Sequence, residues 1–199
     1  MRTANPDAPA KKKIIAAAKE LMLTKGYNDT SVDEICKKSG VAKGSFFHYF
    51  KDKEAVASEA VNCFIHDTGS RMLGCCEGEG DPLRRIYRMI DNTIETTQCP
   101  EFKGCLMGTL LQETFRTHPK LRDACGAGVE GAYTFLEKTF KAAKAKHAPK
   151  SAVDPRKMAE FYLSVVQGSF LLAKAQGSPK VIESNLKTLK QQIQQVFEG

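Results

Sequence analysis

The fold of this chain is decided between residues 30 and 54, where the sequence is TSVDEICKKSGVAKGSFFHYFKDKE. Ser31 and Glu34 have the spacing of a capping box, in which each side chain accepts a hydrogen bond from a backbone NH of the other residue. We therefore expect a helix to begin at Ser31, and Gly40 is placed to end it. A further helix is predicted over Lys43–Phe50, after a turn of only a few residues.

A glycine-containing turn joins these two predicted helices, and the residues around it stand in an informative order. Small Cys36 stands four residues before Gly40, and the large apolar Phe46 stands six residues after it. This is the order of a helix-turn-helix unit, whose second helix enters the major groove of DNA. Phe46, Phe47 and Phe50 are predicted to crowd onto the inner side of that second helix.

Helical spacing of apolar residues recurs along the rest of the chain, and no segment alternates apolar and polar residues over the length of a strand. A first helix is predicted over Lys11–Lys25, so three short helices form a small bundle. A longer helix is expected from about Lys53 to the breaks at Gly78 and Gly80. The remaining helices are expected near residues 83–94, 106–115, 121–146, 158–172 and 182–196. The fold class is therefore all-α, with about nine helices.

The positive charge of the chain is concentrated at its front. The 199 residues carry a formal net charge of +7, and the first 53 residues hold 11 Lys and Arg against 6 Asp and Glu. A basic quarter joined to a nearly neutral remainder predicts one module that binds a polyanion and a second part with another task. Nucleic acid and an anionic membrane surface both remain possible partners at this point.

Composition excludes several other classes of protein. No apolar stretch approaches the roughly 18 residues of a membrane span, and residues 1–10 lack the apolar block of a secretory signal, so a cytoplasmic chain is expected. Seven Cys is an odd number, and no Cys-x-x-Cys pair is present, so free thiols are expected rather than a disulfide framework or a zinc site. We expect neither a metal nor a cofactor.

The stretch quoted above resembles the signature of the TetR/AcrR family of transcriptional regulators, through TSVDEI, SGVAKGS, FFHYF and KDKE at residues 30–35, 39–45, 46–50 and 51–54. The resemblance implies a dimeric repressor whose ligand-binding domain controls release from operator DNA. It implies a flexible tail over residues 1–10, a helix-turn-helix domain over residues 11–53, and a ligand-binding and dimerisation domain over residues 54–199.

The resemblance also assigns residues to DNA by their position. Base edges or nearby phosphates are expected to face Lys43, Gly44, Ser45 and His48, and the DNA backbone is expected to contact Thr30, Tyr49 and Lys53. The physical character of these residues agrees, since glycine permits close approach and lysine neutralises phosphates. Taken alone, His48 would be an ordinary surface histidine. The family usually has Tyr at position 47, so Phe47 lacks one hydroxyl contact to phosphate.

The larger part of the chain supplies an aromatic set with a few polar groups, which suits an apolar pocket for a small-molecule effector. The same residues would also serve plain core packing, because most buried aromatic side chains only fill space. The candidates are Tyr87, Tyr133, Phe161, Tyr162 and Phe170.

The last two predicted helices carry the most regular apolar spacing. The final helix has an apolar residue at alternating intervals of four and three, namely Ile182, Leu186, Leu189, Ile193 and Val196. This spacing predicts that the stripe packs against another helix. One possibility is packing within the monomer. The other is a homodimer through residues 155–176 and 180–197, in which two copies form a four-helix bundle. Dimerisation is favoured because paired DNA half-sites require a two-fold protein.

Cys105 stands at the start of a predicted helix, where exposed NH groups and the helix dipole lower the pKa of a thiol. Residues 104–122 and 168–174 resemble the branch of the family that contains the N-ethylmaleimide reductase repressor. In that branch a cysteine and a lysine sense electrophiles, and the equivalent residues here are Cys105 and Lys174. A purely structural cysteine is the alternative, because relatives without a known redox role share the Gly-Cys pair.

Two other patterns imitate chemical motifs. Residues 126–131 spell a dinucleotide fingerprint, but no strand precedes them, so close helix packing is expected instead. Cys75 and Cys76 are weak evidence for a soft metal without further ligands. No hydrolase or phosphate-loop motif occurs. The chain is therefore not expected to be an enzyme.

The sequence predicts a DNA-binding repressor that leaves a palindromic operator when an inducer binds or when Cys105 is modified. A transcriptional activator of the same family is one alternative. A helical small-molecule carrier or enzyme without DNA function is another. A basic membrane-surface protein is a third, although the Ala-rich first helix would anchor poorly.

Overall fold

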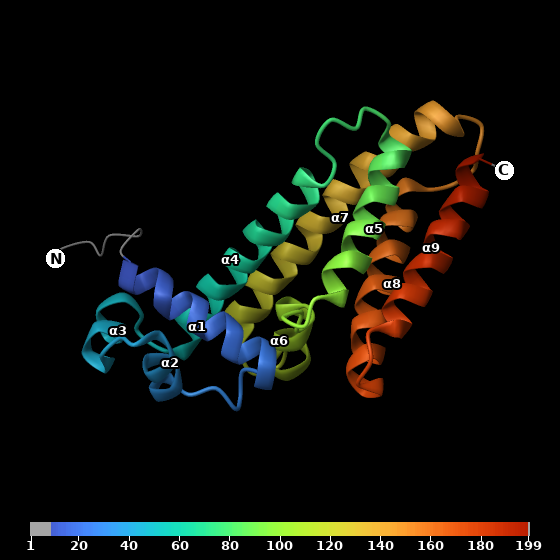
Figure 1. Ribbon diagram of the computed structural model, residues 1–199. Coiled ribbons are helices and arrows are strands. Elements are labelled where there is room, and N and C mark those ends of the chain that lie inside the picture. Colours follow the sequence, from blue (N-terminus) through green and yellow to red (C-terminus); the bar gives the residue numbers. More distant parts are fainter. Residues whose placement is uncertain (1–8, 199) are drawn as a thin grey trace. The chain divides into compact units, whose positions relative to one another are not determined.

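The structure is a computed structural model that describes residues 9–198. These residues form nine α-helices and no strand, in agreement with the all-α prediction (Figure 1). The helices are α1 (Pro9–Lys25), α2 (Val32–Ser39), α3 (Lys43–Tyr49), α4 (Lys53–Gly74), α5 (Pro82–Gln98), α6 (Leu106–Thr114), α7 (Pro119–His147), α8 (Pro155–Gln176) and α9 (Lys180–Glu198). Of the predicted tail, residues 1–8 lie outside the described part, and Pro9 and Ala10 already belong to α1.

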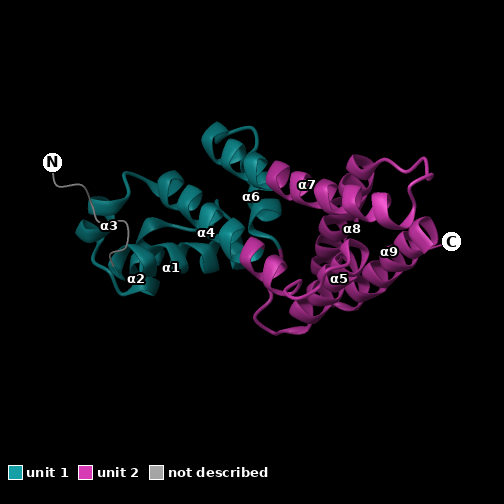
Figure 2. Ribbon diagram, turned by 90° about the horizontal axis from the view of Figure 1, so that it is seen from above, with its two compact units in different colours: residues 1–68, 105–128 teal, residues 69–104, 129–199 magenta. Residues whose placement is uncertain are grey.

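The helices divide into two compact units, each with its own core (Figure 2). Unit 1 contains residues 9–68 and 105–128, and unit 2 contains residues 69–104 and 129–198. Helices α4 and α7 each contribute to both units. Unit 1 also contains α6 and the start of α7, so it is not the same set of residues as the predicted DNA-binding domain. The predicted boundary between residues 53 and 54 concerns function and remains a proposal.

The core of unit 1 forms where the apolar sides of α1 to α4 and α6 meet. Ile14 and Met22 of α1, Ile35 of α2 and Phe46 of α3 are fully buried, and Leu110 of α6 is buried with them. Burying an aliphatic or aromatic side chain of this kind contributes about 1.5–3 kcal/mol. The three short helices of the bundle are therefore held by their mutual packing rather than by helix propensity, which is marginal at such lengths.

The capping box at the start of α2 is present as predicted. The Ser31 hydroxyl accepts a hydrogen bond from Glu34 N at 3.2 Å, and the Glu34 carboxylate accepts one from Ser31 N at 2.9 Å. Glu34 also forms an ion pair with Lys25 of α1. Gly40 ends the helix in the left-handed conformation, with φ of 66°. Local sequence therefore fixes both ends of α2.

Helix α7 runs unbroken through Gly126, Gly128 and Gly131. At Gly128 an added Cβ would lie 2.5 Å from both Ile65 Cδ1 and Met107 Sδ, so any larger residue would require these side chains to move. The apparent dinucleotide fingerprint is helix packing at this residue, as predicted. Helix α4 ends at Gly74, four residues before the predicted break at Gly78.

The core of unit 2 is built by α5, α7, α8 and α9. On α9 the predicted apolar stripe is buried within the monomer, at Ile182, Leu186, Leu189 and Ile193, and α9 packs along α8 and α5. Of the two possibilities for this stripe, packing within the monomer is therefore the one realised. Val196 departs from the prediction, because it is exposed and Phe197 is buried in its place. No helix in the described range is long and apolar enough to cross a membrane.

Candidate nucleic-acid interface

Helix α3 is anchored by two phenylalanines on its inner side. Phe46 and Phe50 are buried in the core of unit 1, with ring centroids 5.6 Å apart. Phe47 does not join them. Its side chain is 50% exposed, which corrects the prediction that all three rings face inward. The reason is helical geometry: residues 46 and 50 are one turn apart, whereas residue 47 is rotated by about 100° from residue 46.

The outer side of α3 gathers four of the residues predicted to face DNA. Lys43, Gly44, Ser45 and His48 are all exposed, and Phe47 lies among them. This set, residues 43–45 with 47 and 48, is called the recognition face below. The sequence analysis placed the ring of Phe47 inside, although the family has a phosphate-contacting residue at position 47, and its helical position was the signal that could have placed it outside.

Lys43 holds the only strong charge of the recognition face. Its ammonium lies 2.7 Å from Asp33 Oδ1 on α2, and both side chains are more than half exposed. The hydrogen bond with Asp33 raises the pKa of Lys43. An exposed ion pair contributes little stability, so the lysine can exchange the carboxylate for a phosphate at small cost.

Tyr49 lies at the edge of the bundle, half-buried against the core of unit 1. Its ring meets His48 edge-on, with centroids 4.9 Å apart. This contact orients the imidazole of His48 at the outer side of the helix. Tyr49 is therefore placed to support the recognition face, and its expected contact with the DNA backbone stays a prediction.

Thr30 is a correction. Its side chain is only 1% exposed, and its hydroxyl donates a hydrogen bond to the Gly26 carbonyl at 2.6 Å. The hydroxyl is thus committed to closing the turn between α1 and α2. It is not available to a phosphate, contrary to the expectation from position.

Lys53 has a partner inside unit 1. Its Nζ donates a hydrogen bond to the Tyr27 carbonyl at 2.8 Å and lies 4.1 Å from the centre of the Tyr27 ring. Burial lowers the pKa of this lysine. Lys53 therefore ties the start of α4 to the turn after α1, and its expected contact with the DNA backbone stays a prediction.

Comparison with known proteins agrees with this geometry. The sequence profile described as "Bacterial regulatory proteins, tetR family" matches residues 14–60, and the profile described as "Tetracyclin repressor-like, C-terminal domain" matches residues 82–189. This chain belongs to the TetR family of transcriptional regulators. Proteins of this family are DNA-binding regulators, not enzymes. They bind operator DNA and typically dimerise through their C-terminal helices.

Individual TetR-family relatives match over nearly the whole chain. The HTH-type transcriptional repressor NemR of Escherichia coli (strain K12) is 26% identical over 179 residues, which cover 89% of this chain and 90% of NemR. The transcriptional regulator AcuR of Cereibacter sphaeroides is 31% identical over 188 residues, covering 92% of this chain and 85% of AcuR. The crystal structure of a regulatory protein TetR from Rhodobacter sphaeroides superposes with a TM-score of 0.84 at 27% identity, covering 92% and 98% of the two chains.

The residues expected to sense an effector are placed separately. Cys105 is the N-cap of α6, as predicted, and its side chain is buried. Lys174 lies against Gly104, the residue before Cys105: a Cβ added at Gly104 would lie 3.2 Å from Lys174 Cε. Gly104 also has φ of 98°, a conformation that favours glycine. Any side chain at position 104 would therefore displace Lys174 and strain the backbone.

The aromatic candidates of unit 2 have different surroundings. Tyr162 is buried in the core, while Tyr87, Tyr133 and Phe170 are half-buried around it. Phe161 is 41% exposed on α8, so it does not line an enclosed pocket as expected. The Tyr87 hydroxyl donates to Glu198 at 3.3 Å, the Arg156 guanidinium lies 4.7 Å from the Tyr133 ring, and Phe170 meets Phe102 edge-on at 5.1 Å.

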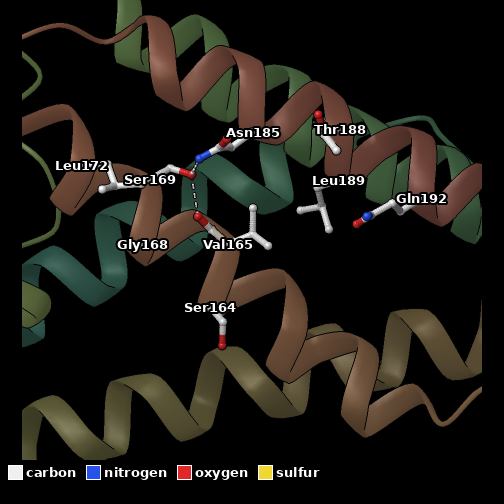
Figure 3. A pocket seen from close by; sticks show the side chains of 9 residues that line it. All are labelled: Ser164, Val165, Gly168, Ser169, Leu172, Asn185, Thr188, Leu189 and Gln192. Carbon is white, nitrogen blue, oxygen red and sulfur yellow. Dashed lines mark hydrogen bonds between the residues drawn. The ribbon is translucent and has the colours of Figure 1, made fainter. Parts of the chain in front are cut away.

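A groove of about 250 Å³ lies on the outer side of α8 and α9 (Figure 3). None of the aromatic candidates lines it. Within the groove, Asn185 donates a hydrogen bond to Ser169 at 3.1 Å, and the Ser169 hydroxyl donates to the Val165 carbonyl at 2.6 Å. Its lining is Ser164, Val165, Gly168, Ser169, Leu172, Asn185, Thr188, Leu189 and Gln192.

Proposed function

We propose that this TetR-family protein is a dimeric repressor that binds a palindromic operator through the recognition face of each copy. The observation that carries the proposal is the division of α3 into two sides. Phe46 and Phe50 fix the helix to the core, and the opposite side presents the recognition face to the solvent. A helix held this way can enter a major groove without reorganising the domain.

Each member of the recognition face has a task that its chemistry suits. Ser45 and His48 can hydrogen-bond base edges, and Gly44 lets the backbone approach the duplex. Phe47 cannot hydrogen-bond, but an exposed ring suits contact with the methyl group of thymine. Lys43 neutralises a phosphate, which adds an affinity term that is independent of sequence and weakens with salt.

Dimerisation is proposed through the outer sides of α8 and α9, in the ranges 155–176 and 180–197. The apolar stripe of α9 is already used inside the monomer, so the contact falls on the opposite side of these helices. That side carries the groove and three exposed apolar side chains, namely Phe161, Leu172 and Val196. An apolar surface of this kind is typical of an interface, and a two-fold pair matches the two half-sites of an operator.

Release from DNA is proposed to follow either an apolar inducer in unit 2, contacted by Tyr87, Tyr133, Tyr162 or Phe170, or modification of the Cys105 thiol. In each case the effector acts by binding more tightly to the arrangement of the dimer that does not fit DNA. Half-sites on one face of DNA recur about every 34–36 Å, so a small change in the spacing of the two heads is enough.

The DNA-binding proposal is tested by titrating the protein with its own promoter region and with random duplex, by fluorescence anisotropy. The promoter region is expected to bind at least about 1,000-fold more tightly. Replacing Ser45 and His48 by Ala removes that preference, whereas His66→Ala, at an exposed histidine of α4, preserves it. Equal affinity of the wild-type protein for both DNAs would contradict specific repression.

The Cys105 proposal is tested by adding N-ethylmaleimide to the protein–operator complex. Operator DNA is expected to be released from the wild-type protein and retained by Cys105→Ser. Cys99→Ser, at an exposed thiol, is the control and should release the DNA as the wild type does. If Cys105→Ser releases the operator DNA as readily as the wild type does, Cys105 is structural only.

A further inference from the structure

Two adjacent cysteines lie in the turn that follows α4, within unit 2. Cys75 Sγ and Cys76 Sγ are 3.8 Å apart. Cys75 is half-buried and its thiol donates to the Met72 carbonyl at 3.2 Å, while Cys76 is 8% exposed and its thiol donates to the Arg85 carbonyl at 3.6 Å. The two side chains therefore point to the same side of the turn, with one thiol accessible and the other directly behind it.

The turn is held in this shape by two arginines of α5. Arg85 Nε donates a hydrogen bond to the Glu79 carbonyl at 2.6 Å, and Arg88 Nη1 donates to the Glu77 carbonyl at 3.4 Å. Their positive charges also lie near the thiols and favour the thiolate form of Cys76, against the larger effect of burial, which raises its pKa to about 11. The sulfur pair is thus preorganised by contacts that do not involve the sulfurs.

The sulfur–sulfur distance favours a bridging atom over a direct bond. A disulfide requires about 2.05 Å between the sulfurs, so the pair would have to close by well over an ångström. One atom bonded to both sulfurs at about 2.3 Å separates them by about 3.8 Å at a tetrahedral angle, and by about 3.3–3.5 Å at the angle of roughly 90–100° of a pyramidal trivalent centre. The pair therefore lies within a few tenths of an ångström of the spacing of a two-sulfur chelate around a trivalent thiophilic centre.

The number of ligands narrows the identity of that centre. Structural zinc requires four protein ligands, and among residues 9–198 no group of three or more His, Cys, Asp or Glu is placed to hold a metal ion. An atom that binds here must form bonds to the two sulfurs and already carry its remaining substituent. A monosubstituted trivalent arsenical, R–As(OH)₂, has this valence, because arsenic forms two bonds to sulfur and keeps one to carbon.

We propose that Cys75 and Cys76 form a chelating site for monosubstituted trivalent arsenicals. The accessible Cys75 thiol reacts first: an S–As bond forms, an As–OH bond breaks, and hydroxide leaves with the thiol proton as water. Cys76 then displaces the second hydroxyl in the same way, and a second water leaves. Arsenic stays trivalent and no electron is transferred. The second step is intramolecular, and its high effective concentration offsets the low thiolate fraction of Cys76.

The test uses phenylarsine oxide with the reduced full-length protein. Intact mass spectrometry is expected to find one phenylarsenic group per chain, with the mass of phenylarsine oxide less one water, which is its hydrate less two waters, and retained in millimolar glutathione. Cys75→Ser and Cys76→Ser are each expected to weaken binding at least about 100-fold, because a chelate becomes a single bond. Cys99→Ser, at an exposed thiol, is expected to bind as the wild type does.

The proposal is overturned if either serine variant binds with wild-type affinity, or if peptide mapping places the arsenic on other cysteines. It is also overturned if glutathione strips the adduct from the wild-type protein. Circular dichroism of each variant verifies that the fold is retained, and the double variant Cys75→Ala/Cys76→Ala, which keeps apolar side chains in the turn, repeats the test if a serine variant fails to fold. The measurement involves no DNA, so its result is independent of the proposed operator binding.

Discussion

Lys43 of α3 and Asp33 of α2 form an ion pair with 2.7 Å between Nζ and Oδ1, although both side chains are largely exposed. Without DNA, the Asp33 carboxylate is the partner of the Lys43 ammonium. The carboxylate therefore lies beside the surface that a phosphate would approach. With the proposed phosphate contact, Asp33 would compete with DNA for Lys43, and its own negative charge would repel the DNA. The proposed phosphate contact would then depend on both charges and not on the lysine alone.

Replacing Lys43 by Ala should weaken binding to all duplexes and lower the slope of log K against log salt by about 1, because one phosphate contact is lost. Asp33→Asn should act in the opposite direction and strengthen binding several-fold. Both effects are measured by anisotropy titrations at several salt concentrations. Lys187→Ala, which breaks the exposed Lys187–Glu183 pair of α9, is the charge-matched control. An unchanged salt slope in Lys43→Ala would show that this lysine does not contact phosphate.

Phe47 should confer a preference for thymine at one position of each half-site. Burying one methyl group contributes about 0.8 kcal/mol, so replacing that thymine by uracil should weaken binding roughly fourfold per half-site. The penalty should vanish in Phe47→Ala, because the ring that contacts the methyl is gone. A scan of uracil substitutions across the operator, in wild type and variant, measures this. Identical penalties in the two proteins would contradict the assignment.

The capping box should contribute measurably to stability. Ser31→Ala removes the side-chain acceptor for Glu34 N and is expected to lower the free energy of unfolding by about 1 kcal/mol. The midpoint of urea unfolding should fall while the m-value stays constant. Ser31→Asp, which keeps an acceptor at the N-cap, should restore most of the loss. A midpoint unaffected by Ser31→Ala would mean that packing alone holds α2.

These predictions depend on how far the sequence determines each residue's place. Ser31, Glu34 and Gly40 were correctly predicted because their interactions are local and obey fixed spacing. Thr30 was misassigned because its hydroxyl donates to the carbonyl of Gly26, and a backbone acceptor leaves no mark in the sequence. The bond from Lys53 to the Tyr27 carbonyl was not foreseen for the same reason. A position carried over from a family signature does not say which way its side chain turns.

The apolar spacing of α9 had a different limit. Periodicity predicts that one side of a helix is covered, but it does not say whether the cover is another helix of the same chain or a second chain. Ile182, Leu186 and Ile193 could therefore not be assigned to a dimer or to the core from sequence, and the structure places them in the core. The three-dimensional arrangement was needed to show which side of α8 and α9 is left for a partner.

The stability of the chain should depend on pH through Glu34. Its hydrogen bonds, first with Lys25 and then with Ser31, lower the pKa of this carboxyl to about 2 in the folded state. A lowered folded-state pKa means that the contribution is complete above the unfolded value near 4.5 and is lost as the pH falls towards 2. The melting temperature should therefore drop between pH 5 and pH 2, and Glu34→Gln should reduce that drop. Glu183→Gln, in an exposed pair on α9, should leave the drop as it is in the wild type.

Gly168 offers a way to break the proposed dimer without unfolding the monomer. It lies in the groove of α8 and α9, and a Cβ added there would meet no other atom within 4 Å in the monomer. Replacing a helical glycine also removes a propensity penalty of about 1 kcal/mol. Gly168→Arg should therefore keep the helix content of the wild type, although loss of the dimer removes the stabilisation that subunit association provides. If this face is the interface, the buried arginine should yield monomers in analytical ultracentrifugation and weaken operator binding by at least tenfold.

Gly131→Arg on α7, where an added Cβ also meets open space, should remain dimeric and bind the operator normally. A dimeric, DNA-binding Gly168→Arg would place the interface elsewhere, because an arginine at the centre of a packed contact cannot be accommodated without separating the helices.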